Sequence, residues 1–157
     1  MKREIKFRAW NPVCKRFESN YDNIYLESDG TVFDSNGSGG VNRVGYDVQL
    51  FTGLKDKNNK EIYEGDILHI EYFKMALGEN LGVYEAEAEL TGVLEFDDLS
   101  LILRNIAGEK WQEYTGYDAG EGKCKFMYLG DVYDGSLDAS YQIEVIGNIY
   151  ENPELLK

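Results

Sequence analysis

The sequence predicts a mainly β protein, made of small barrel-like or highly bent antiparallel sheets with a smaller N-terminal β lobe and a short C-terminal helical turn. The 157 residues include 17 glycines but two prolines, and 13% are aromatic, which favours strands joined by tight turns. Apolar residues recur at every second position in several segments, the period of a half-buried strand. Asn, Asp and Gly cluster between those segments, where they favour turns.

The first strand is predicted from Ile5, where apolar side chains begin to alternate with polar ones, and Asn11-Pro12 ends it. Phe17 then begins a returning segment. The alternate set of residues on this strand is Lys6, Arg8 and Trp10. Trp10 on this polar face either covers a second small cluster, stacks under a cation or marks a contact surface.

A hairpin is predicted over residues 24–33, where Ser28-Asp29-Gly30 separates two short apolar runs. The glycine-rich loop over 35–40 is the expected lobe boundary. We therefore expect an N-terminal β lobe over 1–45 and a main barrel-like β domain over 46–157, or one continuous domain. The loop does not predict a phosphate site, because neither a helix start nor a Lys-Ser or Lys-Thr pair follows it.

Two turns organise the central stretch over residues 52–68. Residues 56–60 form the first, because Asn and Asp accept left-handed backbone conformations. Residues 64–66 form the second, whose glycine allows a positive φ. Ile62 and Tyr63 lie between the turns, too few for an independent strand, and are expected to anchor the loop to the core. Glu64 and Asp66 are expected to be turn carboxylates rather than catalytic residues or metal ligands, because no histidine or third acid stands at ligand spacing.

A strand is predicted over 68–73 and a loop over 74–82. Residues 83–96 are ambiguous, because their alanines and glutamates favour helix whereas apolar residues occupy the even positions. We expect one long strand bent at Gly92, since the period of two is sustained throughout. The odd positions, which include Val93, then form an outer row rich in glutamate. The repulsion between these like charges is tolerable when they are solvated, and the row is useful when a basic partner lies opposite. A carboxylate metal site there is a weaker interpretation, because identical repeats lack convergent geometry.

Shorter elements follow. Strands are expected at 99–103, 126–128 and 141–145, with a loop-rich stretch over 105–122. The ending Asn152-Pro153 predicts one turn of helix, with the asparagine as N-cap and the proline at the first helical position.

Charge and composition exclude several function classes. The net charge is −13, although residues 1–16 carry six basic residues and one acid. Direct nucleic-acid binding is therefore unlikely, because it needs a clustered basic face on the whole protein. No apolar run approaches the roughly 20 residues that cross a bilayer, and no signal peptide is recognisable. We expect a soluble, cytoplasmic protein with no membrane contact.

Catalytic chemistry has no obvious place in the chain. Cys14 and Cys124 are isolated thiols, expected to stay reduced in the cytosol, and His69 is the single histidine. A cysteine nucleophile needs a nearby base, and a histidine among apolar strand residues is usually structural. No catalytic residue, cofactor or metal ligand is predicted.

The segments together resemble the YopX-like family of phage and prophage proteins. The resemblance is carried by residues 3–10, 51–67, 92–96 and 143–156, in the family's order. Two departures are small: Asn11 stands where the family usually has an acid, and Asn59 replaces a turn glycine, whose φ it can adopt. Residues 18–45 and 105–140 carry no recognisable family pattern. The resemblance implies a β-rich fold, a bacteriophage or prophage origin and cytoplasmic expression, but no established activity.

The leading functional hypothesis is a non-enzymatic module that interacts with a host or phage protein. The residues proposed to contact the partner are Trp10, Lys6, Arg8, Glu85, Glu87, Glu89 and Trp111. One version is a nucleic-acid mimic, in which the acidic row imitates spaced phosphates. The alternative is a self-assembling module, in which the basic N-terminal segment packs on an acidic face of a neighbour to give a ring or another closed homo-oligomer. That segment could equally dock on an acidic face of its own chain. An enzyme is the less favoured hypothesis.

Overall fold

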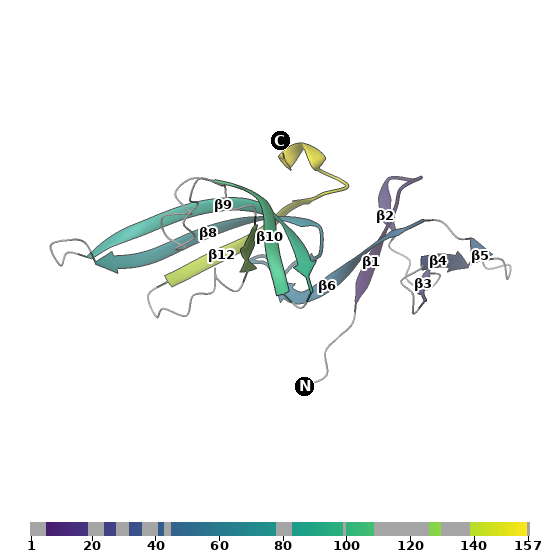
Figure 1. The fold of residues 1–157 in the computed structure, drawn as a ribbon, viewed down its shortest axis with the longest axis horizontal. Coiled ribbons are helices and arrows are strands. Elements are labelled where there is room, and N and C mark those ends of the chain that lie inside the picture. The colour runs from purple at the N-terminus through teal and green to yellow at the C-terminus, as the bar shows by residue number, and fades with distance from the viewer. Residues whose placement is uncertain are drawn as a thin grey trace, which may run out of the picture.

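The computed structural model describes residues 6–18, 24–27, 32–35, 41–42, 45–77, 83–98, 100–108, 126–129 and 139–156. Its elements are almost all strands, which pair antiparallel in sheets of five, four and three strands (Figure 1). The mainly β prediction is therefore confirmed. In the part of the chain that the structure describes, no helix is long and apolar enough to cross a membrane.

The five-stranded sheet is the largest unit and has the order β11-β10-β9-β8-β12. Its strands in chain order are β8 (Asp66–Leu77), β9 (Val83–Asp97), β10 (Ser100–Ala107), β11 (Phe126–Tyr128) and β12 (Ala139–Asn148). The ribbon of β8 and β9 extends along one side of the molecule, and β12 runs beside it (Figure 1). β8 continues through residues 74–77, so the loop predicted from residue 74 starts too early.

The ambiguous segment over 83–96 is a strand, as its period of two predicts. Leu90 and Leu94 lie on one face of β9 and are fully buried, so tertiary packing overrides the helical preference of the alanines and glutamates. The alternation fails at Val93. It was expected on the outer face, but it is 2% exposed and pairs with the buried Ile67. This end of the two strands adjoins a buried polar cluster around Asp66, described below.

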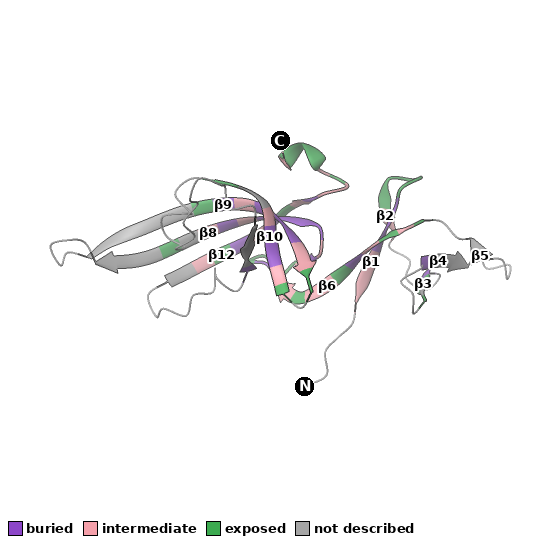
Figure 2. Cartoon of the chain, in the orientation of Figure 1, coloured by how far each residue is buried: buried purple, intermediate pink, exposed green. Residues whose placement is uncertain are grey.

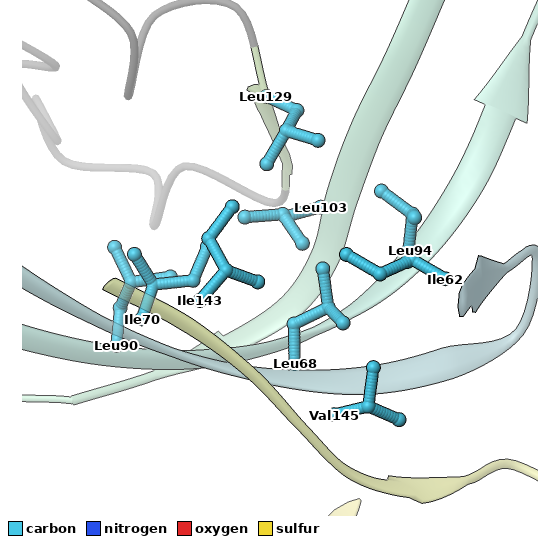
Figure 3. Packing of buried hydrophobic residues seen from close by; sticks show 9 residues of the cluster. All are labelled: Ile62, Leu68, Ile70, Leu90, Leu94, Leu103, Leu129, Ile143 and Val145. Carbon is cyan, nitrogen blue, oxygen red and sulfur yellow. The ribbon is translucent and has the colours of Figure 1, made fainter. Parts of the chain in front are cut away.

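The main core lies against one face of this sheet, where Figure 2 shows buried residues gathered and Figure 3 shows side chains of the sheet packed with Ile62 of β7 (Glu61–Tyr63). Nine residues from distant parts of the sequence make up the cluster: Ile62, Leu68, Ile70, Leu90, Leu94, Leu103, Leu129, Ile143 and Val145. Burying a side chain of this size contributes about 1.5–3 kcal/mol. The predicted anchoring role of Ile62 is thus confirmed.

A four-stranded sheet of order β2-β1-β6-β7 joins the two ends of the molecule. It contains β1 (Phe7–Asn11), β2 (Arg16–Glu18), β6 (Asp47–Lys55) and β7. β7 pairs with β6, so Ile62 and Tyr63 belong to a three-residue strand of this sheet, although too few residues were expected for an independent strand. β1 precedes residue 45 and β6 follows it, and the two strands pair with each other. The division into two lobes at that residue stays a prediction.

The smallest sheet is formed by β3 (Ile24–Leu26), β4 (Val32–Ser35) and β5 (Val41–Asn42). β3 and β4 are the predicted hairpin, with Tyr25 opposite Phe33. Ile24 and Val32 form a second small core with Ala9 of β1. The glycine-rich loop over 36–40 lies outside the described residues.

The turn over residues 56–60 covers the open edge of β12. The Lys57 backbone N–H donates to the Ile143 carbonyl at 2.8 Å, and the Asp56 carboxylate accepts the Val145 N–H at 3.2 Å. Two side-chain contacts to Glu144 follow, from Lys57 at 2.7 Å and from Asn58 at 3.5 Å. A sheet edge with unpaired backbone groups invites aggregation, so this turn protects β12 where a further strand would otherwise pair.

The chain ends in one turn of 3-10 helix, η2 (Pro153–Leu156), close to the predicted helical turn. The Asn152 carbonyl accepts the Leu155 N–H at 3.1 Å. Asn152 directly precedes the helix and Pro153 is its first residue, as predicted. The Oδ1 atom of Asn152 accepts the backbone N–H of Asn148 at 3.3 Å, which ties η2 back to β12.

Candidate functional site

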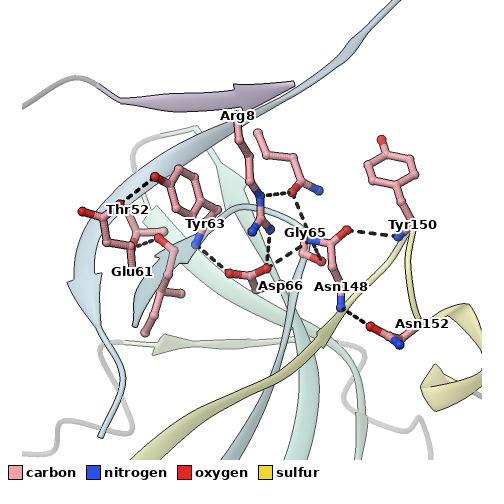
Figure 4. A network of polar contacts seen from close by, with 11 residues as sticks. Arg8, Thr52, Glu61, Tyr63, Gly65, Asp66, Asn148, Tyr150 and Asn152 are labelled. Atoms are coloured by element: carbon pink, nitrogen blue, oxygen red, sulfur yellow. Dashed lines mark hydrogen bonds and ion pairs between the residues drawn. The ribbon is translucent and has the colours of Figure 1, made fainter. Parts of the chain in front are cut away.

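A buried polar cluster, here called the junction, connects β1, β6, β8 and β12 (Figure 4). Asp66, at the start of β8, is 1% exposed and accepts hydrogen bonds from Arg8 and from the Tyr63 backbone N–H at 2.8 Å. Asn148 is 2% exposed and donates through Nδ2 to Gln49, to the Gly65 carbonyl and to Asp66, at 3.0, 2.9 and 3.1 Å. Every charged group of the junction therefore has a polar partner.

Gly65 makes the close approach in this cluster possible. Its φ is +77°, and a Cβ at this position would lie 2.1 Å from Gln49 Nε2. Glycine adopts positive φ without the clash that other residues suffer. The expected turn with a positive φ at Gly65 is thus confirmed.

Aromatic rings enclose the Arg8 guanidinium. Its carbon lies 4.3 Å from the ring centroid of Phe17 and 4.6 Å from that of Tyr63. Trp10 stacks on Tyr150, with the ring centroids 5.3 Å apart, and meets Phe17 edge-on. Burial is the main reason why the pKa of Tyr150 is raised, and a hydrogen bond with Asp47 adds to it.

The junction is a structural anchor. The Arg8 guanidinium donates to Gln49 and to Asp66 and lies between two aromatic rings, so its charge is compensated within the cluster. Asp66 accepts the Tyr63 backbone N–H across the turn, as expected of a turn carboxylate, and it is also buried in an ion pair with Arg8. Within the described ranges, no group of three or more His, Cys, Asp or Glu side chains is placed to hold a metal ion.

A second feature is the outer face of the five-stranded sheet, opposite the main core. Residues directly opposite each other across antiparallel strands share a face. Glu71 of β8 stands opposite Glu89 of β9, and His69 stands opposite Glu144 of β12. We call these four residues the acidic face: His69, Glu71, Glu89 and Glu144.

The groups of the acidic face differ in their partners. A hydrogen bond from Lys57 lowers the pKa of Glu144, and the same contact raises the pKa of Lys57. His69 lies 3.5 Å from the Thr91 hydroxyl and 3.9 Å from Glu71. Among the described residues, no Lys or Arg lies within ion-pair distance of Glu71 or Glu89.

The predicted contact residues fall into three groups. Trp10 is 6% exposed, which favours the packing alternative and leaves little of the ring for a partner. Lys6 and Arg8 pair with Glu61 and Asp66. These two residues of the basic segment therefore pair with acids of their own chain.

The remaining contact residues lie on or beyond β9. Glu89 is exposed. Glu85 and Glu87 are placed on the strand as alternate residues of the same row. Trp111 lies outside the described residues. Further along β9, Glu95 pairs with Arg104 of β10 at 2.6 Å, so a cation does lie beside the acidic row there.

A cysteine–histidine pair does not occur among the described residues. Cys14 is exposed in the turn between β1 and β2, whereas His69 lies on the acidic face of the five-stranded sheet. Cys124 lies outside the described residues.

The fold and the junction define a class of protein: a β protein of bent antiparallel sheets, whose first strand is fastened to the start of β8 and the end of β12. The chain belongs to the YopX protein family, because the family model matches residues 6–157. A solved structure, protein EF1440 from Enterococcus faecalis, is similar with a TM-score of 0.46 and 24% identity, covering 99% of this chain and 100% of that chain. This likeness is too low to bear on function. No curated protein matches the sequence.

Proposed function

We propose that this protein is a non-enzymatic interaction module that binds a basic surface of a protein partner through its acidic face. The phage or prophage setting that the sequence suggests would make this partner a host or phage protein. The acidic face lies on three neighbouring strands of the five-stranded sheet. Charge complementarity across an interface directs the recognition of another macromolecule.

One observation carries the proposal: Glu71 and Glu89 stand directly opposite each other across β8 and β9. Like charges directly opposite each other destabilise a sheet. Residues that serve a function can carry a cost in stability. A cationic partner would relieve the repulsion, so the same pair that weakens the free protein would strengthen the complex.

A competing explanation is that the acidic residues only keep the protein soluble, which is the usual effect of a large net charge. The two explanations differ in what happens when the charges are moved elsewhere. Solubility depends on total charge, whereas binding depends on the position of the charge.

The test compares two double variants that each remove two exposed negative charges. Glu71→Gln with Glu89→Gln acts on the acidic face, and Glu151→Gln with Glu154→Gln acts on the C-terminal segment. Tagged wild type and both variants are used to capture proteins from an extract of the source organism at low and high salt. We expect a basic protein that binds wild type and the C-terminal variant, but not the acidic-face variant, and whose binding weakens with salt.

Stability provides a second measurement on the same variants. The acidic-face variant should be more stable than wild type to urea by up to about 1 kcal/mol, because the repulsion is removed. Capture of the same proteins by all three chains would contradict the proposal.

A further inference from the structure

We propose that His69 makes the acidic face sensitive to pH, so that protonation of its imidazole weakens the binding of a cationic partner. This inference rests on the proposed function, since it concerns the regulation of the same surface. Histidine is the side-chain type that ordinarily changes charge between pH 5 and 8. His69 is the single histidine of the chain, and it stands on the surface that is proposed to bind.

The imidazole of His69 lies among the polar groups of the acidic face. Its Nε2 atom is 3.9 Å from Oε1 of Glu71, two residues along β8. Glu144 stands directly opposite His69 on β12. Thr91 stands directly opposite on β9, with its hydroxyl oxygen 3.5 Å from Nδ1. A proton on the imidazole would therefore place a positive charge within ion-pair distance of Glu71.

Two further charges lie near this pair among the described residues, one on β9 and one in the turn over residues 56–60. Glu89 of β9 is directly opposite Glu71. Lys57 of the turn pairs with Glu144 at 2.7 Å. The pKa of Lys57 is raised chiefly by this hydrogen bond, and the charge of Glu71 adds to the effect. The charges of the turn, β8 and β12 therefore act on one another across this face.

The side chains of the acidic face are accessible enough for a partner to contact them. His69 is 26% exposed and Glu71 is 32% exposed. With a neutral imidazole, Glu71 can pair with a lysine or arginine of the partner. An imidazolium would instead pair with Glu71 within the chain and repel the approaching cation.

The proton and the cation of the partner therefore compete for the same carboxylate. Linkage requires the competition to be reciprocal: if protonation weakens cation binding, then cation binding must release a proton. A purely structural role for His69, packed against the Thr91 hydroxyl, predicts neither effect. The release of protons thus separates the two roles.

The test uses the full chain without a tag and a capped pentalysine peptide as the cationic probe. Affinity is measured by calorimetry at low ionic strength, at about pH 7 and about pH 5.5, an interval in which histidine is the side chain that ordinarily titrates. The lysines of the probe keep their charge throughout. His69→Gln supplies an uncharged polar side chain at the same position, and His69→Lys supplies a permanent cation.

Wild type should bind the probe about three- to five-fold more weakly at the lower pH, the size of effect expected for one exposed charge pair. His69→Gln should bind equally at both pH values, with the affinity of wild type at neutral pH. His69→Lys should bind weakly at both. Calorimetry in buffers with different heats of ionisation should show that wild type releases protons on binding and that His69→Gln does not. The proton release of wild type needs no substitution, so the test holds even if a variant fails to fold.

Three results would overturn the inference: equal affinity of wild type at the two pH values, the same pH dependence in His69→Gln, or no binding of the probe by any chain. The proposed function is decided separately. Binding that is lost in Glu71→Gln with Glu89→Gln but does not depend on pH would refute the role of His69 and still support the acidic face as a binding surface. The capture experiment tests that surface without reference to His69.

Discussion

The guanidinium of Arg8 donates to the carboxylate of Asp66, which lies 58 residues further along the chain. The Arg8 side chain is 15% exposed and that of Asp66 is 1% exposed, so the pair is shielded from water. It fastens the first strand to the first residue of the five-stranded sheet. The consequences for stability can be measured.

Asp66→Asn should destabilise the protein by about 3–5 kcal/mol, because it leaves a buried guanidinium without its counter-charge. The measurement is urea denaturation followed by circular dichroism. Glu61→Gln is the matched control, since it breaks the pair with Lys6, whose side chain is 36% exposed, and should cost at most about 1 kcal/mol. Equal losses in the two variants would contradict a special role for the junction.

Gly65→Ala should cost at least about 2 kcal/mol, because a Cβ is strained at positive φ and would displace the Gln49 amide from the junction. Gly45→Ala makes the same chemical change where no atom lies within 4 Å of the added carbon. It should be neutral or slightly stabilising. Thermal and urea denaturation of both variants would show the difference, and similar midpoints would refute it.

Trp10→Ala should destabilise the chain by about 3–5 kcal/mol, because the ring packs between Tyr150 and Phe17. Val13 is also apolar and near in sequence but is 79% exposed. Val13→Ala should therefore change the free energy of unfolding by less than about 0.5 kcal/mol. If the tryptophan served only as a partner contact, its removal would leave stability unchanged.

Asp56 should make stability depend on pH. Burial raises its pKa, but the backbone N–H groups of Lys60, Val145 and Asn58 lower it by more, so the folded pKa lies below the ordinary 3.8. A depressed folded pKa adds stability that is complete above the unfolded pKa and is lost as pH falls through the folded value. Asp56→Asn should therefore have a lower free energy of unfolding than wild type at neutral pH, and this difference should become smaller below about pH 4. Urea denaturation of both proteins across this pH range is the measurement. A difference in free energy of unfolding that does not change with pH would contradict the role of Asp56.

Asn59 has a φ of +65°, the left-handed conformation expected for a residue in place of a turn glycine. Asn59→Gly should be close to neutral, whereas Asn59→Val should cost about 1–2 kcal/mol, because a β-branched residue resists this conformation. Asn58→Val in the same turn is the control, since Asn58 does not have a positive φ. A comparable loss at both positions would show that the backbone conformation is not the cause.

Much of the fold could be predicted because strand periodicity is a local signal. Residues 83–96 illustrate this, since Leu90 and Leu94 alternate correctly although the neighbouring glutamates favour helix. The limits appear where burial comes from elements distant in sequence. Val93 was expected outside and is buried, and the three residues of β7 pair only because β6 lies beside them.

The junction could not be predicted residue by residue. Arg8 and Asp66 each fit a simple local interpretation, one on the polar face of a strand and the other in a turn, and nothing in their spacing links them. The only available signal was the basic charge of the first sixteen residues, which suggested docking on an acidic face of the same chain. The pairing of Glu71 with Glu89 could not be predicted either, because it depends on the register between β8 and β9.

The stack of Trp10 on Tyr150 has a consequence for how the protein is made. The Trp10 ring is synthesised long before Tyr150, which lies far along the chain. The ring therefore lacks this stacking partner until Tyr150 has emerged, and folding that depends on contacts between distant parts of the chain is slow. A nascent chain that stalls before Tyr150 would keep its first tryptophan in water, where chaperones and proteases can bind it.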